Sequence, residues 1–167
     1  MTNFPGMIMQ TQRRAHSLEL KVPPVALMII AAFWIWLGVV YFPELSFEFP
    51  LQWTLSCMIG VLGVVVCTLG VVQFKRAETT VNPTKPEKSS SLVKTGIYRQ
   101  TRNPMYLGFL LLLGAWAGWM GNVISFLALP VFVLYLNQFQ IRPEERALSS
   151  LFGDEFREYR CNVRRWI

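Results

Sequence analysis

The sequence predicts an all-α integral membrane protein with four transmembrane helices, because its apolar residues gather in long uncharged blocks and its basic residues lie only outside them. Hydrophobic residues make up 53% of the chain and the mean hydropathy is +0.36, above the values of ordinary soluble domains. Uncharged blocks cover residues 22–42, 51–74 and 105–139. A helix needs about 20 apolar residues to cross a bilayer, so the first two blocks each predict one span.

The third block is too long for one span and contains a turn signal, G-W-M-G-N, at residues 118–122. We therefore predict a tight hairpin of two short helices, at about 105–119 and 123–139. Helices of this length must stand nearly upright, or the bilayer must become thinner around them.

The positions of the charges predict the orientation. All 16 Lys and Arg residues lie in segments 1–21, 75–104 and 140–167, whereas the loop 43–50 carries only Glu44 and Glu48. Basic loops stay on the cytoplasmic side of a membrane, so both termini are expected in the cytoplasm, with the plasma (inner) membrane as the location. An aromatic belt is expected near the outer interface, formed by Tyr41, Trp53, Trp116 and Trp119.

Composition also argues against several classes of function. The net charge of +6 is explained by topology and by attraction to anionic lipid, so nucleic-acid binding is not expected. Cys57, Cys67 and Cys161 have no metal-ligand spacing. The single histidine, His16, lies in the N-terminal arm. A long polar stretch precedes the first apolar block, and we expect no cleavable signal there.

Three parts follow along the chain. Residues 1–21 are predicted to be a cytoplasmic arm, residues 22–74 the first pair of transmembrane helices, and residues 75–167 a core that contains a polar connector, the hairpin 105–139 and a C-terminal helix. The last segment, from Pro143, is predicted to be an amphipathic helix that breaks at Gly153. Its apolar residues recur at steps of three and four: Leu148, Leu151, Phe152, Phe156, Tyr159 and Val163.

Two polar clusters flank the predicted hairpin and should emerge at the same level of the membrane. One contains Tyr98, Arg102, Asn103, Pro104 and Tyr106, with Asn103 as a helix cap and Pro104 at the first helical position. The second cluster contains Gln140, Arg142, Glu144 and Glu145. A structural interpretation stays open, in which Arg102 anchors the helix at the interface and the two glutamates only begin the last helix, whose dipole favours acids.

Small residues at positions 114 and 118 match a small-xxx-small pattern. Such spacing is typical of close helix packing, and we expect packing rather than a cofactor turn here.

Two runs carry a family resemblance: L-V-K-T-G-I-Y-R-Q-T-R-N-P-M-Y-L-G at 92–108 and R-P-E-E-R-A-L-S-S-L-F-G-D-E-F-R-E-Y at 142–159. In this order and around a hydrophobic hairpin, they closely resemble the membrane methyltransferases, which include isoprenylcysteine carboxyl methyltransferases and phospholipid N-methyltransferases. The similarity covers about residues 82–163. It implies transfer of a methyl group from S-adenosylmethionine to a lipidic or small hydrophobic acceptor at the membrane.

The resemblance also implies the site residues. The cytoplasmic connector, the ends of the last helices and the C-terminal segment would form the cofactor pocket. Arg142 is the candidate for contact with a carboxylate of the substrate or cofactor, and Glu145, or Glu144, is the nearest base if one is needed; Arg142 and Glu145 are thus the predicted catalytic residues. The residues expected to bind the cofactor are Leu92, Val93, Tyr98, Arg102, Asn103, Pro104, Met105, Tyr106, Glu144 and Glu145.

The chain departs from the family pattern at two positions: asparagine at 103 can still cap a helix and donate a hydrogen bond, so cofactor binding can survive, whereas the loss of arginine near 140 weakens the expectation of a carboxylate substrate. The prenylcysteine enzymes usually have histidine at the position of Asn103 and tend to have arginine near the position of Gln140. Three alternatives to a methyltransferase remain: a small transporter or channel subunit, a scaffold without catalysis, and an NADPH-dependent membrane reductase. A transporter normally needs an ionisable residue within a span, and the predicted spans contain no Asp, Glu, Lys, Arg or His.

Overall fold

The computed structural model describes residues 19–77 and 91–167. The predictions for the arm before residue 19, which includes His16, and for residues 78–90 of the connector lie outside the described residues. Within the described part, the secondary structure is helical, with a single isolated bridge between Ser46 and Asn122 and no strand. The all-helical prediction is therefore confirmed for these residues.

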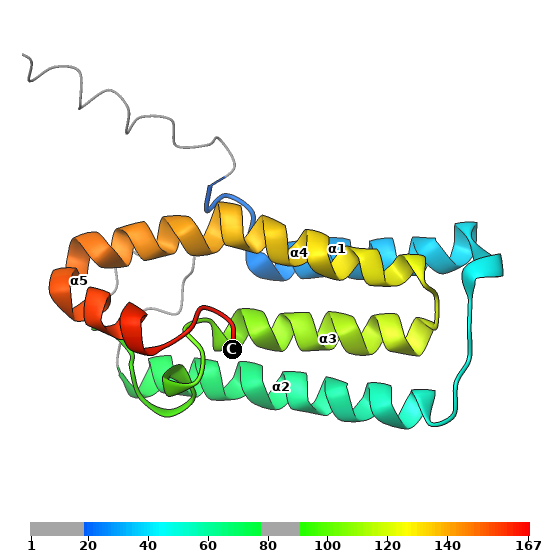
Figure 1. Cartoon of the computed structure of the whole chain (residues 1–167), viewed down its shortest axis with the longest axis horizontal. Coiled ribbons are helices and arrows are strands. Elements are labelled where there is room, and N and C mark those ends of the chain that lie inside the picture. The colour runs from blue at the N-terminus through cyan, green and yellow to red at the C-terminus, as the bar shows by residue number, and fades with distance from the viewer. Residues whose placement is uncertain (1–18, 78–90) are drawn as a thin grey trace, which may run out of the picture.

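The helices form an elongated bundle (Figure 1). The bounds of the long helices are α1 Pro24–Tyr41, α2 Gln52–Arg76, α3 Pro104–Met120, α4 Ala128–Leu136 and α5 Arg142–Asn162. Short helical turns, η1 Pro43–Leu45, η3 Gly96–Arg99 and η4 Ile124–Leu127, join them, and a π-helical turn, η5 Asn137–Ile141, connects α4 to α5.

Three helices are long and apolar enough to cross a membrane: α1, α2 and the continuous helix Ile124–Asn162. The apolar part of this last helix ends before Arg142, where the charged sequence of α5 begins. The fourth predicted span, α3, is apolar but has 17 residues. At 1.5 Å per residue, it is slightly shorter than the roughly 30 Å hydrocarbon layer of a bilayer.

The structure corrects the expectation that a new helix begins at Pro143. Instead, the hairpin helix continues through η5 into α5. A proline inside a helix normally clashes with the carbonyl group four residues earlier, which here belongs to Phe139. The wider π-helical turn accommodates the ring, and the Phe139 carbonyl accepts a hydrogen bond from the backbone N–H of Leu20 at 3.0 Å.

Glycines on α2 and α3 allow these two helices to approach closely. A Cβ on Gly108 would lie 2.7 Å from the Cβ of Cys67 and 2.8 Å from the carbonyl oxygen of Gly63. The predicted close packing is confirmed at Gly118, where a Cβ would lie 2.9 Å from the Ser56 hydroxyl oxygen. The prediction is wrong at Gly114, where an added Cβ would meet nothing within 4 Å. The contact with α2 follows the face of α3 that carries Gly108.

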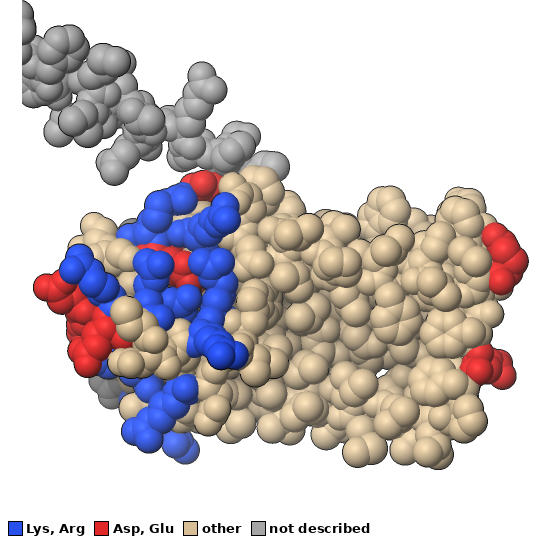
Figure 2. Space-filling model, in the orientation of Figure 1, with Lys and Arg blue, Asp and Glu red and all other residues tan. Residues whose placement is uncertain are grey.

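Charge is segregated along the bundle. Figure 2 shows that Lys and Arg gather over the end formed by α5, while the middle of the visible face is uncharged and the opposite end carries only acidic groups. Buried amides connect the loops at that opposite end. Gln52 donates to the carbonyl of Gly118 at 2.9 Å, and Asn122 donates to that of Phe42 at 2.8 Å. These bonds satisfy the buried side-chain amides of Gln52 and Asn122, which would otherwise lack partners.

The close packing of α2 and α3 predicts a strong difference between two glycine substitutions. Gly108→Ala should destabilise the protein by about 1–3 kcal/mol, because the new methyl group meets backbone atoms that cannot move aside cheaply. Gly114→Ala should cause no loss, since its methyl group enters open space. Thermal unfolding in detergent measures both, and equal effects of the two substitutions would contradict this packing.

Candidate functional site

The two polar clusters flanking the hairpin meet at the charged end of the bundle. The Tyr106 hydroxyl, in the first turn of α3, donates a hydrogen bond to Oε1 of Glu144 in the first turn of α5. Arg102, just before α3, forms an ion pair with Glu145, with Nη2 and Oε1 3.1 Å apart. Segments that lie about 40 residues apart in the sequence therefore form one site.

The loop before α3 positions Arg102. Asn103 occupies the N-cap position, but its side chain makes no capping hydrogen bond. Its amide donates instead to the backbone carbonyl of Arg165 at 2.8 Å, and its backbone N–H donates to the Thr101 hydroxyl at 3.1 Å. The predicted helix start is therefore confirmed, with Asn103 at the N-cap and Pro104 at the first helical position, but the Asn103 side chain binds the C-terminal residues and makes no capping bond.

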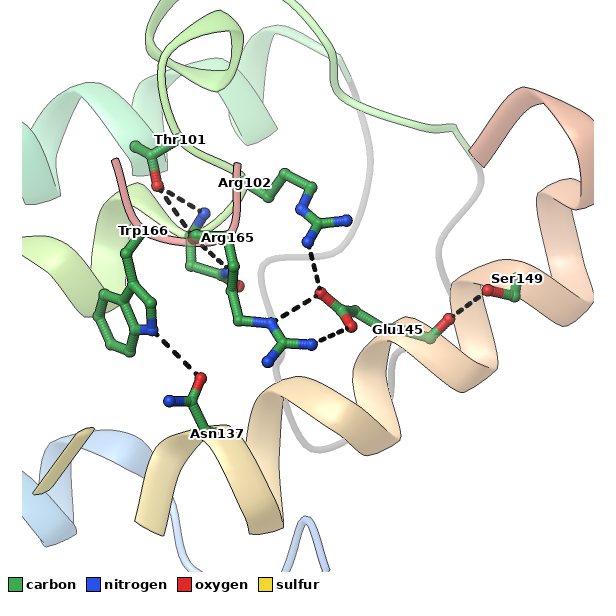
Figure 3. A network of polar contacts seen from close by, with 8 residues as sticks. Thr101, Arg102, Asn137, Glu145, Ser149, Arg165 and Trp166 are labelled. Carbon is green, nitrogen blue, oxygen red and sulfur yellow. Dashed lines mark hydrogen bonds and ion pairs between the residues drawn. The ribbon is translucent and has the colours of Figure 1, made fainter. Parts of the chain in front are cut away.

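Glu145 is held between two arginines (Figure 3). Its Oε1 accepts from Arg102 and from Nε of Arg165 at 3.1 Å each, and its Oε2 accepts from Nη2 of Arg165 at 2.7 Å. The contact with Arg165 is bidentate, a strong geometry for a carboxylate. With the Glu145 side chain only 12% exposed, the group is a fixed anion with its charge already balanced.

Glu144 lies in a different environment from its neighbour. Its carboxyl contacts Tyr106, and no ion pair with a basic group is formed by it among the described residues. Burial raises the pKa of Glu144 to about 8; the negative charge of Glu145 also raises it, while the hydrogen bond from Tyr106 opposes the change. The structure thus places one charged and one largely protonated carboxyl side by side.

Arg102 has unused hydrogen-bonding capacity. Its Nε and Nη1 are buried and have no hydrogen-bond partner among the described residues. Burial lowers the pKa of Arg102, and the charge of Glu145 counteracts this. Because a buried N–H group without a partner costs free energy, these two free nitrogens are suited to an anionic ligand such as a carboxylate.

Aromatic residues form the wall between α2, η3 and α5. Tyr98 is buried and its ring contacts that of Phe74 edge-on, with centroids 5.4 Å apart. The Tyr159 hydroxyl donates to the Tyr98 backbone carbonyl at 2.7 Å. Burial and the nearby Tyr159 and Glu144 raise the pKa of Tyr98, so the phenol stays neutral and contributes an apolar face.

The remaining residues predicted from the sequence lie in several environments. Val93 and Pro104 are buried, while Leu92 and Met105 are partly exposed. Pro104 and Met105 contact Gly70 of α2, which gives them a packing role. Arg142 is exposed and donates to the side-chain oxygen of Gln138, so it lies at the surface beside the site.

Gln140 is fully buried. Its amide nitrogen donates to the Val22 carbonyl at 3.4 Å, and its Oε1 has no partner among the described residues.

Four residues of the site were not predicted from the sequence: Thr101, Asn137, Arg165 and Trp166. The Trp166 indole N–H donates to Oδ1 of Asn137 in η5 at 3.1 Å. Trp166 and Arg165 follow the second motif, in a short charged tail with no periodicity, so spacing gave no signal for them. Only the count of charges could have indicated a further arginine, because the two acids of the second cluster face a single arginine, Arg102, in the first cluster.

The raised pKa of Glu144 predicts a pH dependence of stability. Between its ordinary value of 4.5 and its folded value of about 8, the folded protein retains a proton that the unfolded chain has released. Stability should therefore fall as pH rises through this window, by at most about 1.4 kcal/mol per pH unit, and level off above it. Glu144→Gln should flatten the decline, as measured by thermal unfolding in detergent from pH 5 to 9.

Glu158→Gln provides the matched control for that experiment, because it removes an exposed carboxyl from the same helix. Its pH profile should follow that of the unmodified protein. Identical profiles for all three proteins would contradict the assignment of the proton to Glu144.

Comparison with known proteins identifies relatives of this chain. An uncharacterized protein of Haemophilus influenzae is 52% identical over 63 residues, which are 38% of this chain and all of that protein. Protein-S-isoprenylcysteine O-methyltransferase of Saccharomyces cerevisiae is 33% identical over 131 residues, which are 73% of this chain and 53% of the yeast enzyme. Methanethiol S-methyltransferase of Pseudomonas deceptionensis is 32% identical over 92 residues, 53% of this chain and 32% of that enzyme.

The chain thus spans about half of the length of the yeast enzyme and about a third of the length of the Pseudomonas enzyme. A family model described as phospholipid methyltransferase matches residues 51–155, which include α2, the described part of the connector, the hairpin and the first half of α5. With its apolar helices and its relatives among membrane methyltransferases, this is an integral membrane protein, and it belongs to the phospholipid methyltransferase family.

Proposed function

We propose that this protein transfers a methyl group from S-adenosylmethionine to a lipidic or small hydrophobic acceptor at the membrane. One observation carries the proposal: a buried arginine with two free N–H groups and a carboxyl without a basic partner lie in one site. Family membership and the named methyltransferase relatives support the reaction type.

The polar groups fit the amino-acid end of the cofactor. Arg102 offers the N–H groups of Nε and Nη1 to a carboxylate, and hydrogen bonds from a charged guanidinium to a carboxylate are strong. Glu144 offers an acceptor to an ammonium group, and the Tyr106 hydroxyl holds it in place. An arriving positive charge favours the ionised form of a carboxyl, so Glu144 should release its proton when the ligand binds.

When bound, S-adenosylmethionine supplies a methyl group on a positively charged sulfur that a nucleophile can attack in line. The residues here have three tasks: to hold the two reactants in alignment, to exclude water, and to accept a proton where the acceptor carries one. Alignment alone contributes effective molarities of about 10⁵ M or more in favourable cases. Buried Tyr98 and Tyr106 provide apolar faces, and a thiolate or free amine acceptor would need little further help.

If the acceptor must lose a proton, Glu144 is the better base of the two acids. The ammonium group of the bound cofactor favours the ionised form of Glu144, and an ionised carboxyl can accept a proton. The two oxygens of Glu145 are already bound to arginines. Arg142, exposed beside the site, remains the candidate for contact with an acidic group of the substrate.

An apolar groove supports a hydrophobic acceptor. It has a volume of about 710 Å³ and runs between α1 and α4, and it contains none of the polar residues of the site. We therefore assign it to the hydrocarbon part of an acceptor that arrives from the membrane, not to the cofactor. Residues that line it include Leu27, Ala31, Trp34, Leu37, Phe132 and Tyr135.

We further infer that α3 completes a set of four transmembrane helices and that both termini face the cytoplasm. The segregation of basic side chains at one end of the bundle supports this orientation (Figure 2). The site would then lie at the inner leaflet, where soluble cofactor and membrane-bound acceptor can both reach it.

Calorimetric titration of the purified protein with S-adenosylhomocysteine tests the cofactor assignment. Tyr106→Phe and Glu144→Gln should each raise the Kd at least tenfold, because each disturbs the acceptor for the ammonium group. Glu158→Gln should leave the Kd unchanged, because it removes an exposed carboxyl from the same helix, outside the site. NADPH binding in place of S-adenosylhomocysteine would identify a reductase.

Mass spectrometry of products then identifies the acceptor. The protein is incubated with methyl-labelled S-adenosylmethionine and a membrane lipid extract, and separately with a small thiol. Label on one of these acceptors is expected. Intact binding of S-adenosylhomocysteine without any labelled product would indicate a scaffold that has lost catalysis.

A further inference from the structure

The last residues of the chain, 163–167, which we call the C-terminal tail, lie across the start of α3. Val163 is extended (φ −128°, ψ 131°) and ends α5. The backbone N–H of Arg102 donates to the Arg164 carbonyl at 3.0 Å, and the Thr101 hydroxyl donates to the Arg165 carbonyl at 3.2 Å. With the Asn103 amide at 2.8 Å, three consecutive residues before α3 bind the backbone of the tail.

Side chains attach the same tail to the other segments of the site. Arg165 binds Glu145 in the first turn of α5, and the Trp166 indole binds Asn137 in η5 (Figure 3). Trp166 also packs against the hydrophobic core of the bundle. The tail therefore connects the start of α3, the start of α5 and the π-helical turn, all of which border the proposed cofactor site.

Two residues assigned to the cofactor by family resemblance have their polar atoms engaged by this tail. The Asn103 amide nitrogen donates to a tail carbonyl, and both oxygens of Glu145 accept from Arg165. Glu145 also holds one nitrogen of Arg102, which leaves the other two nitrogens of that guanidinium free. The tail and Glu145 thus fix the direction in which Arg102 presents its free donors.

The family resemblance already places the C-terminal segment at the cofactor pocket; we propose that Arg165 of the tail, Glu145 and Asn103 are positioning residues that hold the tail against the start of α3 and orient Arg102, instead of binding the cofactor. The proposal rests on the proposed function, since the ligand is the amino-acid end of S-adenosylmethionine or S-adenosylhomocysteine. Loss of the Arg165–Glu145 contact should release the tail and leave Arg102 without a fixed orientation.

Adjacent arginines provide a matched test. Arg165→Gln and Arg164→Gln each remove one positive charge from the tail. The Arg164 side chain is exposed and has no hydrogen bond or ion pair to a described residue, whereas the Arg165 side chain binds Glu145. Two quantities are measured on each full-length variant: the Kd for S-adenosylhomocysteine, and the hydrogen-exchange rate of the Arg102 backbone amide without ligand. The second reports the tail directly, because that amide donates to it.

We expect Arg165→Gln to raise the Kd at least tenfold and to accelerate exchange at Arg102 at least tenfold, while Arg164→Gln changes each less than twofold. Arg165→Lys, which keeps the charge and loses the bidentate contact, should fall between the two. A chain that ends at Val163 should reproduce the Arg165→Gln result with an unchanged helical content by circular dichroism.

Three results would overturn the proposal. Faster exchange with an unchanged Kd would show that the tail does not orient Arg102 for the ligand. Unchanged exchange in Arg165→Gln would show that the ion pair does not hold the tail. Equal effects of the two glutamine variants would indicate a general effect of charge. If the unmodified protein does not bind S-adenosylhomocysteine, the proposed function fails, while the exchange comparison still decides whether Arg165 holds the tail.

Discussion

A charged group can remain at the edge of an apolar helical bundle only when it is paired, and this constraint organises the polar end of the protein. Glu145 lies where the apolar part of the last long helix gives way to charged sequence. Removing its charge from water is costly unless cations compensate, and Arg102 and Arg165 do so from two other segments. The ion pairs therefore fix how α3, α5 and the C-terminal residues meet.

The same constraint explains why neighbouring acids differ so much. Two arginines satisfy Glu145, and the described residues supply no third cation to Glu144. A buried carboxyl without a cation is stabilised in its protonated form, and Glu144 follows this rule. It lies beside the free donors of Arg102, which with Oε1 of Gln140 are the buried side-chain atoms that have no hydrogen-bond partner among the described residues. Such departures from local consistency are expected at functional sites.

Much of the fold could be predicted from the sequence because the bilayer imposes simple rules. Uncharged blocks 22–42 and 51–74 became α1, Pro24–Tyr41, and α2, Gln52–Arg76, within two residues at each end. The hairpin turn at Gly121 was visible from its glycines and asparagine. The passage from α4 to α5 was not, because Pro143 predicts a boundary, whereas the π-helical turn η5 accommodates the proline ring and Leu20 donates to the Phe139 carbonyl. Packing at Gly114 was also predicted wrongly, because the spacing of small residues does not show which face of α3 contacts α2.

The site, like the fold, was predictable from the sequence only in part. The meeting of the two polar clusters was predictable, since it follows from an antiparallel hairpin with acids just beyond it, whereas the pairs Tyr106–Glu144 and Arg102–Glu145 come from the structure. The contributions of Thr101, Asn137, Arg165 and Trp166 depend on where the chain turns after α5, and no periodic pattern encodes that turn. The family resemblance implied that Asn103 and Glu145 bind the cofactor, whereas the structure gives both of them protein partners.

A structure of the protein with S-adenosylhomocysteine bound in lipid nanodiscs tests the central claim most directly. We predict that the ligand carboxylate lies within hydrogen-bond distance of Nε or Nη1 of Arg102 and that its amino group contacts Glu144, with Glu145 still bound to both arginines. A ligand located elsewhere, or bound to Glu145 with Arg165 displaced, would contradict the account.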